Sequence, residues 1–207
     1  MEIKPDYRLK GDDLSCIRDD RVLFEELVFE LIPGQVLLLE GKNGSGKTSL
    51  LRILCGFREP DTGQLTWCGD AINDGQYYAD MAYVGHLDGV KKELTVLENL
   101  KVSLALGRPG QYSIQQALKK VHLLNYDDVL VQALSAGQKR RLSLARLLIT
   151  QNIVWILDEP FTSLDKQGIM LIESLLSEHC AKGGMIVLTS HHDIDLHGVD
   201  VQRINLS

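Results

Sequence analysis

A glycine-rich octapeptide near the start of the chain carries residue types that bind phosphate. It matches the pattern G-x-x-x-x-G-K-[ST] at every fixed position and consists of Gly41, Lys42, Asn43, Gly44, Ser45, Gly46, Lys47 and Thr48. Glycines let the backbone turn tightly, so that its N–H groups converge on phosphate oxygens, and the start of a helix adds attraction for the anion. The octapeptide therefore predicts a nucleotide site, which we extend to the next residue, Ser49.

Two side chains of the octapeptide have distinct chemistry. Lys47 provides a mobile positive charge for the β- and γ-phosphates, and Thr48 offers a hydroxyl to Mg²⁺, which prefers oxygen ligands. Apolar residues 36–39 predict a buried strand before the loop, and residues 48–54 predict a helix after it, as such a site requires. The alternative is a flexible turn of small residues that only precedes a core helix.

Three polar residues in the second half of the chain come after continuous apolar runs. Asp158 is predicted to hold Mg²⁺ together with Thr48, and Glu159 to orient and deprotonate a water. His191 is predicted to lie near the γ-phosphate, because ligands gather at the carboxyl ends of strands in open α/β sheets. The alternatives are that Asp158 and Glu159 only cap a strand and that His191 is a surface histidine in a turn.

The elements that must position these residues alternate between apolar strands and helices. Buried strands are predicted at residues 36–39, 153–157 and 185–188, and shorter ones within 14–32, at 64–67 and at 82–84. Helices are predicted in a mainly helical insertion at residues 93–133, broken at 107–110, and at 136–150 and 166–180. This alternation predicts an α/β fold with a parallel sheet covered on both faces.

A short polar segment precedes the helix predicted at residues 136–150. Ser135, followed three residues later by Gln138, is typical of a helix capping box. The exposed backbone N–H groups around Ser135 and the nearby Gly137 are also typical of an anion site, since helix starts attract negative charge. Both interpretations are compatible.

The bulk properties favour one ordinary intracellular domain. The 207 residues carry a formal net charge of −6, which is the wrong sign for a protein that neutralises nucleic-acid phosphates, so no nucleic-acid partner is expected. No apolar run reaches the length of a membrane span, and residues 1–6 lack the apolar core of a secretion signal, so we expect the chain in the cytosol. The four cysteines are too scattered for a zinc site or a disulfide scaffold and are expected to be reduced, small apolar residues.

In their order and separations, these motifs resemble those of the ATP-binding cassette (ABC) ATPases. The matching positions are residues 41–48, 134–138, 153–159 and 163–165 and His191. The resemblance spans about residues 14–193 and implies a P-loop NTPase with a mainly parallel sheet, an N-terminal antiparallel β subdomain and a helical signature subdomain. It further implies that residues 1–207 form a single nucleotide-binding domain, with the helical subdomain inserted at about 87–150.

The resemblance also implies a head-to-tail homodimer that hydrolyses ATP with Mg²⁺. Residues implied to act on one ATP are those of the phosphate loop, with Lys47 in a catalytic role, together with Asp158, Glu159 and His191. Ser135 and Gly137 are implied to contact the ATP of the opposite subunit, and Gln138 and Asp165 are further nucleotide-binding candidates. Hydrolysis would be attack by a water on the γ-phosphate, with catalysis mainly by positioning and charge stabilisation.

Two positions depart from the pattern of the family. The strand-end residue that is usually glutamine is His86, which we retain as a catalytic candidate. The residue that usually stacks an aromatic ring on adenine falls near Arg18, whose planar guanidinium can also stack on a ring. The preference for ATP over GTP is therefore left open by the sequence.

Within the family, the chain is similar to the ATPases of bacterial haem-exporter complexes. The segments that carry this similarity are residues 48–54, 83–86, 93–100 and 155–162. It implies integral membrane permease subunits as partners, docked through the loop after His86 and the helical insertion, and a peripheral position on the cytoplasmic side of the inner membrane. ATP would serve to release a haem-loaded chaperone for cytochrome c maturation, and the cargo itself is not encoded here.

Three other functions compete with this interpretation. They are the ATPase of another ABC transporter, a soluble ABC ATPase of the iron–sulfur assembly type, and a P-loop kinase or GTPase. Neither a kinase nor a GTPase needs the serine and glycine segment that precedes the strand at residues 153–157. Recovery of a membrane subunit or of soluble scaffold proteins with the native chain distinguishes the first two.

Overall fold

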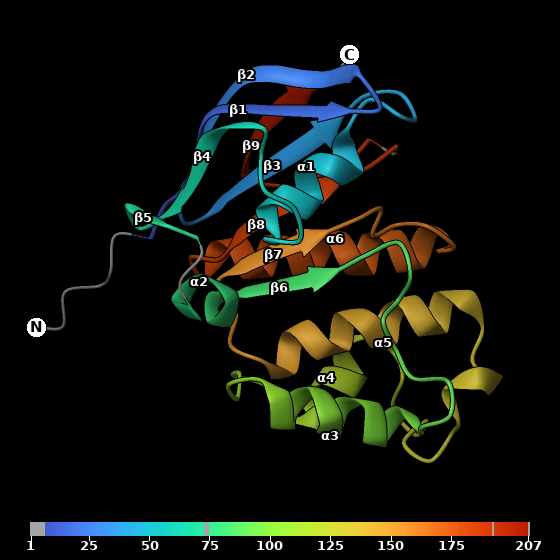
Figure 1. Ribbon diagram of the computed structural model, residues 1–207. Helices are drawn as coiled ribbons and strands as arrows, with labels where there is room; N and C mark the ends of the chain where they lie inside the picture. Colours follow the sequence, from blue (N-terminus) through green and yellow to red (C-terminus); the bar gives the residue numbers. More distant parts are fainter. Residues whose placement is uncertain (1–6, 73–74, 192, 207) are drawn as a thin grey trace, which may run out of the picture.

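The computed structural model describes residues 7–72, 75–191 and 193–206, so His192 and residues 1–6, where we expected no secretion signal, lie outside it. Its elements form three layers, with an antiparallel sheet at the top of Figure 1, a parallel sheet in the middle and a group of helices below. The expectation of an α/β fold is confirmed.

The antiparallel sheet is built from the N-terminal part of the chain. Its strands, in the order β2-β1-β4-β5, are β1 (Leu9–Arg18), β2 (Arg21–Leu31), β4 (Thr62–Trp67) and β5 (Asp70–Ala71). Asp19 and Asp20, with φ of 51° and 58°, form the two-residue turn between β1 and β2, because this geometry matches the twist of a hairpin. The expectation of short edge strands within residues 14–32 was wrong in extent, since the two strands have 10 and 11 residues.

The parallel sheet forms the centre of the molecule. Its strands, in spatial order, are β6 (Met81–Val84), β7 (Val154–Leu157), β8 (Met185–Thr189), β3 (Gln35–Glu40) and β9 (Asp200–Asn205). All its pairings are parallel, and β8 lies between β7 and β3. Strand β9 escaped the sequence analysis because it is a half-exposed edge strand without a continuous apolar run.

Both faces of this sheet are buried, which explains its continuous apolar strands. In β3, Val36 and Leu38 belong to the core shared with the helices below the sheet, while Leu37 and Leu39 belong to the core shared with the antiparallel sheet. Alternate side chains of a strand point to opposite faces, so a strand covered on both faces must be apolar throughout.

Helices connect most of the strands. They are α1 (Lys47–Leu54), α2 (Gly75–Asp80), α3 (Val96–Leu106), α4 (Ile114–Lys120), the 3₁₀ turn Val131–Ala133, α5 (Ala136–Ile149) and α6 (Lys166–Ala181). Helices α3, α4 and α5 lie together at the bottom of Figure 1, where the helical insertion was expected, although its boundaries at 87 and 150 remain a prediction. Helix α2 was not predicted. Among the described residues, no helix is both long and apolar enough to cross a membrane.

No disulfide joins the four cysteines, all of which are described residues, and three of the four are buried. Cys16, Cys55 and Cys180 are therefore the small apolar residues that the sequence led us to expect. Cys68 departs from that expectation, because it is exposed at the turn before β5 with a φ of 55°.

Candidate functional site

The order of the parallel strands brings three polar segments to one edge of the sheet. The phosphate loop follows β3, Asp158 and Glu159 follow β7, and His191 follows β8, all at the carboxyl ends of their strands. Because β8 lies between β7 and β3, its end stands between the phosphate loop and the two carboxylates. In open α/β sheets this edge is where ligands bind.

The phosphate loop has the geometry of an anion cradle. Gly44 and Gly46 have φ of 82° and 106°, a region that residues with a Cβ rarely adopt, and Gly46 directly precedes α1. Lys47 is buried and turns back over the loop, where its Nζ donates to the carbonyl oxygens of Gly41 at 2.5 Å and Lys42 at 3.1 Å. Ser45 Oγ is buried and has no hydrogen-bond partner among the described residues. The positive φ of the two glycines and the charge of Lys47 at the start of α1 suit the loop to an anion.

A cleft of about 660 Å³ opens at this edge. Eleven of its lining residues were predicted from the sequence, namely Arg18, Asn43, Gly44, Gly46, Lys47, Thr48, Ser49, His86, Asp158, Glu159 and His191. Leu23 and Thr162 complete the lining and were not predicted. Gly41, Lys42 and Ser45 do not line the cleft and instead shape the loop beneath it, where a Cβ on Gly41 would lie 2.2 Å from the carbonyl oxygen of Leu206.

The hydroxyl of Thr189, the last residue of β8, holds Asp158 and Glu159 in place. It donates to Asp158 Oδ1 at 2.8 Å and accepts the backbone N–H of Glu159 at 2.8 Å. Glu159 has a φ of 51°, a strained value for a residue other than glycine, which the surrounding contacts must stabilise. Its Oε1 lies 3.4 Å from His191 Nε2, although this atom of the glutamate has no hydrogen-bond partner among the described residues.

The two positions that depart from the family pattern both line the cleft and are exposed. Arg18 ends β1, and its Nε lies 3.5 Å from a carboxylate oxygen of Asp19. His86 lies two residues beyond the end of β6, the strand that pairs with β7, after which Glu159 follows. Both are therefore placed to contact a ligand in the cleft.

The segment that resembles the ABC signature lies outside the cleft. Ser135 and Gln138 form the predicted capping box at the start of α5, with Gln138 N 3.2 Å from Ser135 Oγ and Ser135 N 2.8 Å from Gln138 Oε1. Ser135 is exposed, whereas Gly137 is half-buried. A Cβ at Gly137 would lie 3.0 Å from the carbonyl oxygen of Ser163. Asp165 caps α6 by accepting the N–H of Gly168 at 2.8 Å. The chain therefore does not bring these residues to its own phosphate loop.

Sequence reasoning missed Thr189, which the structure makes a direct partner of both carboxylate residues. The sequence contained a signal, because Thr189 is a hydroxyl residue directly after the apolar run at residues 185–188. The structure shows that it is fully buried. Polar atoms buried in this way are almost always hydrogen-bonded, so a partner at the same sheet edge was to be expected.

The fold and this site define a P-loop nucleotide-binding domain. A comparison with protein families matches residues 24–162 to the family described as ABC transporter. A Pyrococcus furiosus structure described as a putative ABC transporter ATP-binding protein superposes with a TM-score of 0.82 at 26% identity and covers 96% of this chain and 97% of that one. The chain belongs to the ABC transporter family.

Proteins named cytochrome c biogenesis ATP-binding export protein CcmA are similar to the chain over nearly its whole length. The protein of that name from Methylococcus capsulatus is 49% identical over 206 residues, which are 98% of this chain and 99% of the relative. One from Vibrio vulnificus is 45% identical over 202 residues, covering 96% of this chain and 98% of the relative.

Proposed function

We propose that the chain is the ATP-hydrolysing subunit of a cytochrome c biogenesis exporter, in which hydrolysis drives release of a haem-loaded chaperone. Membership of the ABC transporter family supports nucleotide binding, which in this family generally involves Mg²⁺. The relatives named for cytochrome c biogenesis and export, at 43–49% identity, support the particular exporter. The observation that carries the proposal is the cleft in which the phosphate loop, Asp158, Glu159 and His191 meet.

The cleft residues divide the work of hydrolysis by their chemistry. Lys47 neutralises charge on the β- and γ-phosphates, and its present partners are neutral carbonyl groups that it can exchange for phosphate oxygens. Glu159 accepts a proton from the attacking water. His191, whose Nε2 lies 3.4 Å from Glu159 Oε1, contacts the γ-phosphate beside it. Arg18 stacks on the base of the nucleotide, and His86 lines the same cleft as Glu159.

Thr48 and Asp158 are the residues that would hold Mg²⁺. Both line the cleft, and Asp158 keeps one carboxylate oxygen engaged with Thr189, which fixes its orientation. Hydroxyl and carboxylate oxygens suit this metal, which keeps several waters and neutralises phosphate charge when bound.

A second copy of the chain completes the site in this proposal. Ser135 is exposed at the N-terminus of α5, where helix N–H groups attract anions, and neither it nor Gly137 reaches the cleft of its own subunit. In a head-to-tail homodimer, Ser135, Gly137 and Gln138 contact the γ-phosphate of the partner's ATP, with Asp165 nearby. The ABC family as a whole supports a dimeric ATPase bound to membrane permeases.

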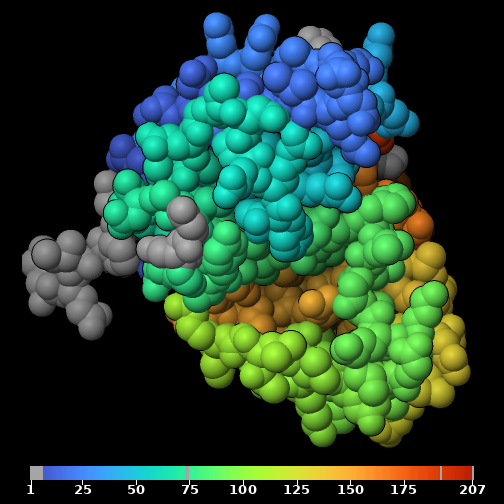
Figure 2. Space-filling model, in the orientation of Figure 1, coloured from blue at the N-terminus to red at the C-terminus, as the bar shows by residue number. Residues whose placement is uncertain are grey.

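The proposed docking surface for the permease is a groove of about 530 Å³ between β6 and α3. Figure 2 shows a hollow that faces the viewer between the middle layer and the helices below it. Leu106 and Lys91 lie along this groove, and Leu106 is 85% exposed. Leu87, in the loop directly after His86, is 83% exposed, so apolar side chains are available next to the cleft. This arrangement supports a peripheral protein held at the cytoplasmic side of the inner membrane by its partners.

Replacement of Glu159 by Gln tests the proposal, because it removes the proton acceptor while it keeps the size of the side chain. We expect the E159Q chain, co-expressed with its genomic neighbours, to lose ATP hydrolysis by about 100-fold or more and to accumulate as an ATP-bound dimer. Size-exclusion chromatography with light scattering measures the dimer, and a phosphate-release assay measures hydrolysis.

The control is Glu173→Gln, a carboxylate on α6 that accepts the backbone N–H of Asp195 at 3.1 Å, outside the cleft. It should leave both hydrolysis and the monomer–dimer equilibrium unchanged. Recovery of E159Q as a monomer that phosphorylates a small molecule would contradict the proposal. Recovery of the wild-type chain with soluble scaffold proteins and without a membrane subunit would favour iron–sulfur assembly instead.

A further inference from the structure

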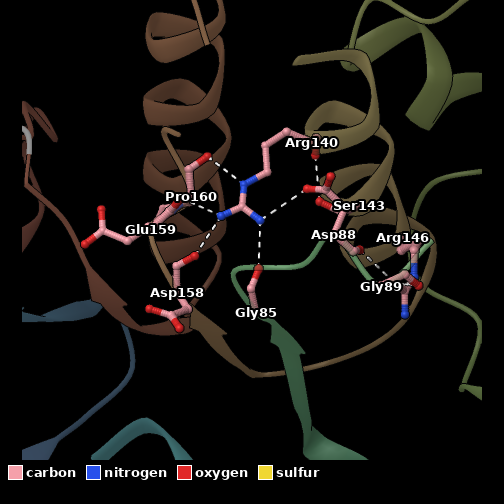
Figure 3. A network of polar contacts seen from close by, with 9 residues as sticks. All are labelled: Gly85, Asp88, Gly89, Arg140, Ser143, Arg146, Asp158, Glu159 and Pro160. Carbon is pink, nitrogen blue, oxygen red and sulfur yellow. Dashed lines mark hydrogen bonds and ion pairs between the residues drawn. The ribbon is translucent and has the colours of Figure 1, made fainter. Parts of the chain in front are cut away.

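Arg140, on the second turn of α5, is a buried arginine whose guanidinium contacts two other segments of the chain. It is 2% exposed, and Figure 3 shows it between the end of β6 and the segment after β7. Its Nε donates to the carbonyl oxygen of Pro160 at 3.2 Å, and its Nη2 donates to that of Asp158 at 2.7 Å and to that of Glu159. Three consecutive carbonyl groups after β7 are thus held by one side chain.

The same guanidinium reaches the loop that carries His86. Its Nη1 donates to the carbonyl oxygen of Gly85 at 2.9 Å and lies 3.4 Å from Asp88 Oδ1. Burial lowers the pKa of Arg140 below its ordinary value, while Asp88, Asp158 and Glu159 raise it again by their negative charge. Only arginine combines a permanent charge with donors fixed in one plane. A lysine could therefore not hold the segment after β7 and the loop after β6 at the same time.

We propose that Arg140 is a positioning residue for ATP hydrolysis, which fixes the placement of Glu159 relative to His86, the two residues that line the cleft next to the segments it contacts. The proposal rests on the ATPase function argued above. Arg140 does not line the cleft, so it acts through the backbone of the residues that do. Glu159 needs such support, because its backbone has the strained φ of 51°.

The position of Arg140 on α5 adds a second consequence. Ser135, which caps this helix, lies fewer than two turns away, and the helix between them is continuous. A contact that a second copy of the chain makes at Ser135 is therefore connected to the carbonyl groups of Asp158 and Glu159 through Arg140. Assembly of the dimer and the placement of Glu159 would be coupled by this side chain.

Two other arginines of α5 make contacts that do not reach the segment after β7. Arg146 donates to the carbonyl oxygen of Gly89 at 2.9 Å, and its Nε donates to Ser103 Oγ at 3.0 Å, so it holds only the other side of the same loop. Arg141 donates to the carbonyl oxygen of Val121 at 3.3 Å, at the end of α4. These residues are matched controls, because they share the side chain and the helix of Arg140.

The test compares ATP hydrolysis and ATP binding in Arg140→Gln, Arg140→Lys and Arg141→Gln with the wild type. We expect R140Q to lower kcat by about 30-fold while the Kd for ATP, measured by fluorescent nucleotide displacement without turnover, changes by less than about threefold. R140K should recover only part of kcat, and R141Q should match the wild type. A destabilised chain would lose binding and hydrolysis together, so this split separates positioning from a merely structural role.

Hydrogen exchange gives a readout that does not depend on turnover. Peptides that contain residues 83–90 and 157–163 should both exchange faster in R140Q, whereas Arg146→Gln should affect only the first. If R140Q does not fold, Asp88→Asn replaces it, since this variant removes one charged partner of Arg140, and it should lower kcat by about threefold to tenfold with unchanged Kd.

Three results would overturn the inference in distinguishable ways. If R140Q keeps the wild-type kcat and the wild-type exchange rate at residues 157–163, the role of Arg140 is refuted, whereas the proposed function is not. Equal losses of kcat and ATP affinity in R140Q, R140K and D88N would reduce Arg140 to a structural residue. Absence of hydrolysis in the wild type itself would refute the proposed function, while the exchange data would still report whether Arg140 holds both segments.

Discussion

Polar atoms at the carboxyl edge of the parallel sheet lack hydrogen-bond partners among the described residues, whereas charged groups near its amino edge are paired with one another. Ser45 Oγ and Glu159 Oε1, both at the carboxyl edge, are buried without a hydrogen-bond partner among the described residues. Trp155 Nε1, on the second of the four residues of β7, is a third buried atom without such a partner.

A compact ionic cluster ties the helical layer to α6 near the amino edge. Glu178 lies near the end of α6 and accepts hydrogen bonds from Lys120 at 2.7 Å, from Lys182 at 2.6 Å and from the hydroxyl of Tyr112. The two ammonium groups also lie 4.8 Å and 4.9 Å from the centre of the Tyr112 ring. Each charge here already has its partner within the chain.

The difference indicates that the carboxyl edge of the parallel sheet is arranged to bind a ligand, whereas the cluster near the amino edge contributes to stability. The unpaired acceptor Glu159 Oε1 costs free energy that a ligand in the cleft can recover, whereas the saturated cluster at the amino edge has nothing to exchange. The three predictions below test whether the two edges are separable in this way, in order of decreasing effect.

The largest effect is expected from Thr189→Val, which keeps the shape of the side chain and removes its hydroxyl. The N–H of Glu159 and one oxygen of Asp158 would lose a partner, which costs about 1–3 kcal/mol in the free energy of unfolding. We also expect kcat for ATP to fall by about tenfold, because both residues line the cleft. Urea unfolding and a phosphate-release assay measure the two effects.

Thr150→Val is the control for that variant, because its hydroxyl only donates to the carbonyl oxygen of Arg146 at 2.9 Å. It should cost less than about 1 kcal/mol and leave kcat unchanged. Equal kcat values in T189V and the wild type would mean that the carboxyl edge does not depend on this hydroxyl.

An intermediate effect is expected from His179→Phe, and it appears only in acid. Burial lowers the pKa of His179 from its ordinary value of 6.5 to about 4, since the ring stacks on Trp155 with centroids 3.7 Å apart. The stability that this shift contributes is complete above pH 6.5 and is lost as the pH falls to about 4. The phenylalanine variant should therefore lose about 2 kcal/mol less stability than the wild type between pH 7 and pH 4.

Urea unfolding at pH 7, 5.5 and 4 measures this difference. The carbonyl oxygen of Ile153, which His179 Nε2 contacts at 3.1 Å, still accepts the N–H of Met185, so the variant leaves no orphaned group there. His197→Phe, at an exposed position, should follow the wild type. Parallel curves for H179F and the wild type would show that the ring does not titrate in a buried site.

The smallest effect is expected from Glu178→Gln. Partial burial alone would raise the pKa of Glu178, but the hydrogen bonds from Lys120, Lys182 and Tyr112 outweigh it and lower the pKa from 4.5 to about 2. The resulting stability is complete above pH 4.5 and is lost as the pH falls through about 2. Because the groups are about one third exposed, we expect a loss of only about 1 kcal/mol at pH 7.

The loss in E178Q should shrink at pH 3.5 and in 1 M salt, while kcat for ATP should remain at the wild-type value. Glu30→Gln, which breaks the exposed ion pair with Arg8 on the antiparallel sheet, should cost less. A fall in kcat in E178Q would break the proposed separation of the two edges, because the amino edge would then contribute to the chemistry.

Much of the fold followed from local patterns. Continuous apolar runs located β3, β7 and β8, and the serine and glutamine spacing located the start of α5. The weakly patterned β9 and the short α2 could not be found in this way, because their stability comes from neighbours rather than from their own residues.

The sequence by itself determined the chemistry of the site, because the phosphate loop and the pair Asp158 and Glu159 are contiguous segments whose residue types and spacing can be recognised along the chain. The tertiary structure alone decided that β8 separates β3 from β7, which places Thr189 against both carboxylate residues. It also decided that Arg140 meets partners up to 55 residues away. Contacts of this kind depend on which strands and helices pack together, and spacing along the chain does not record that.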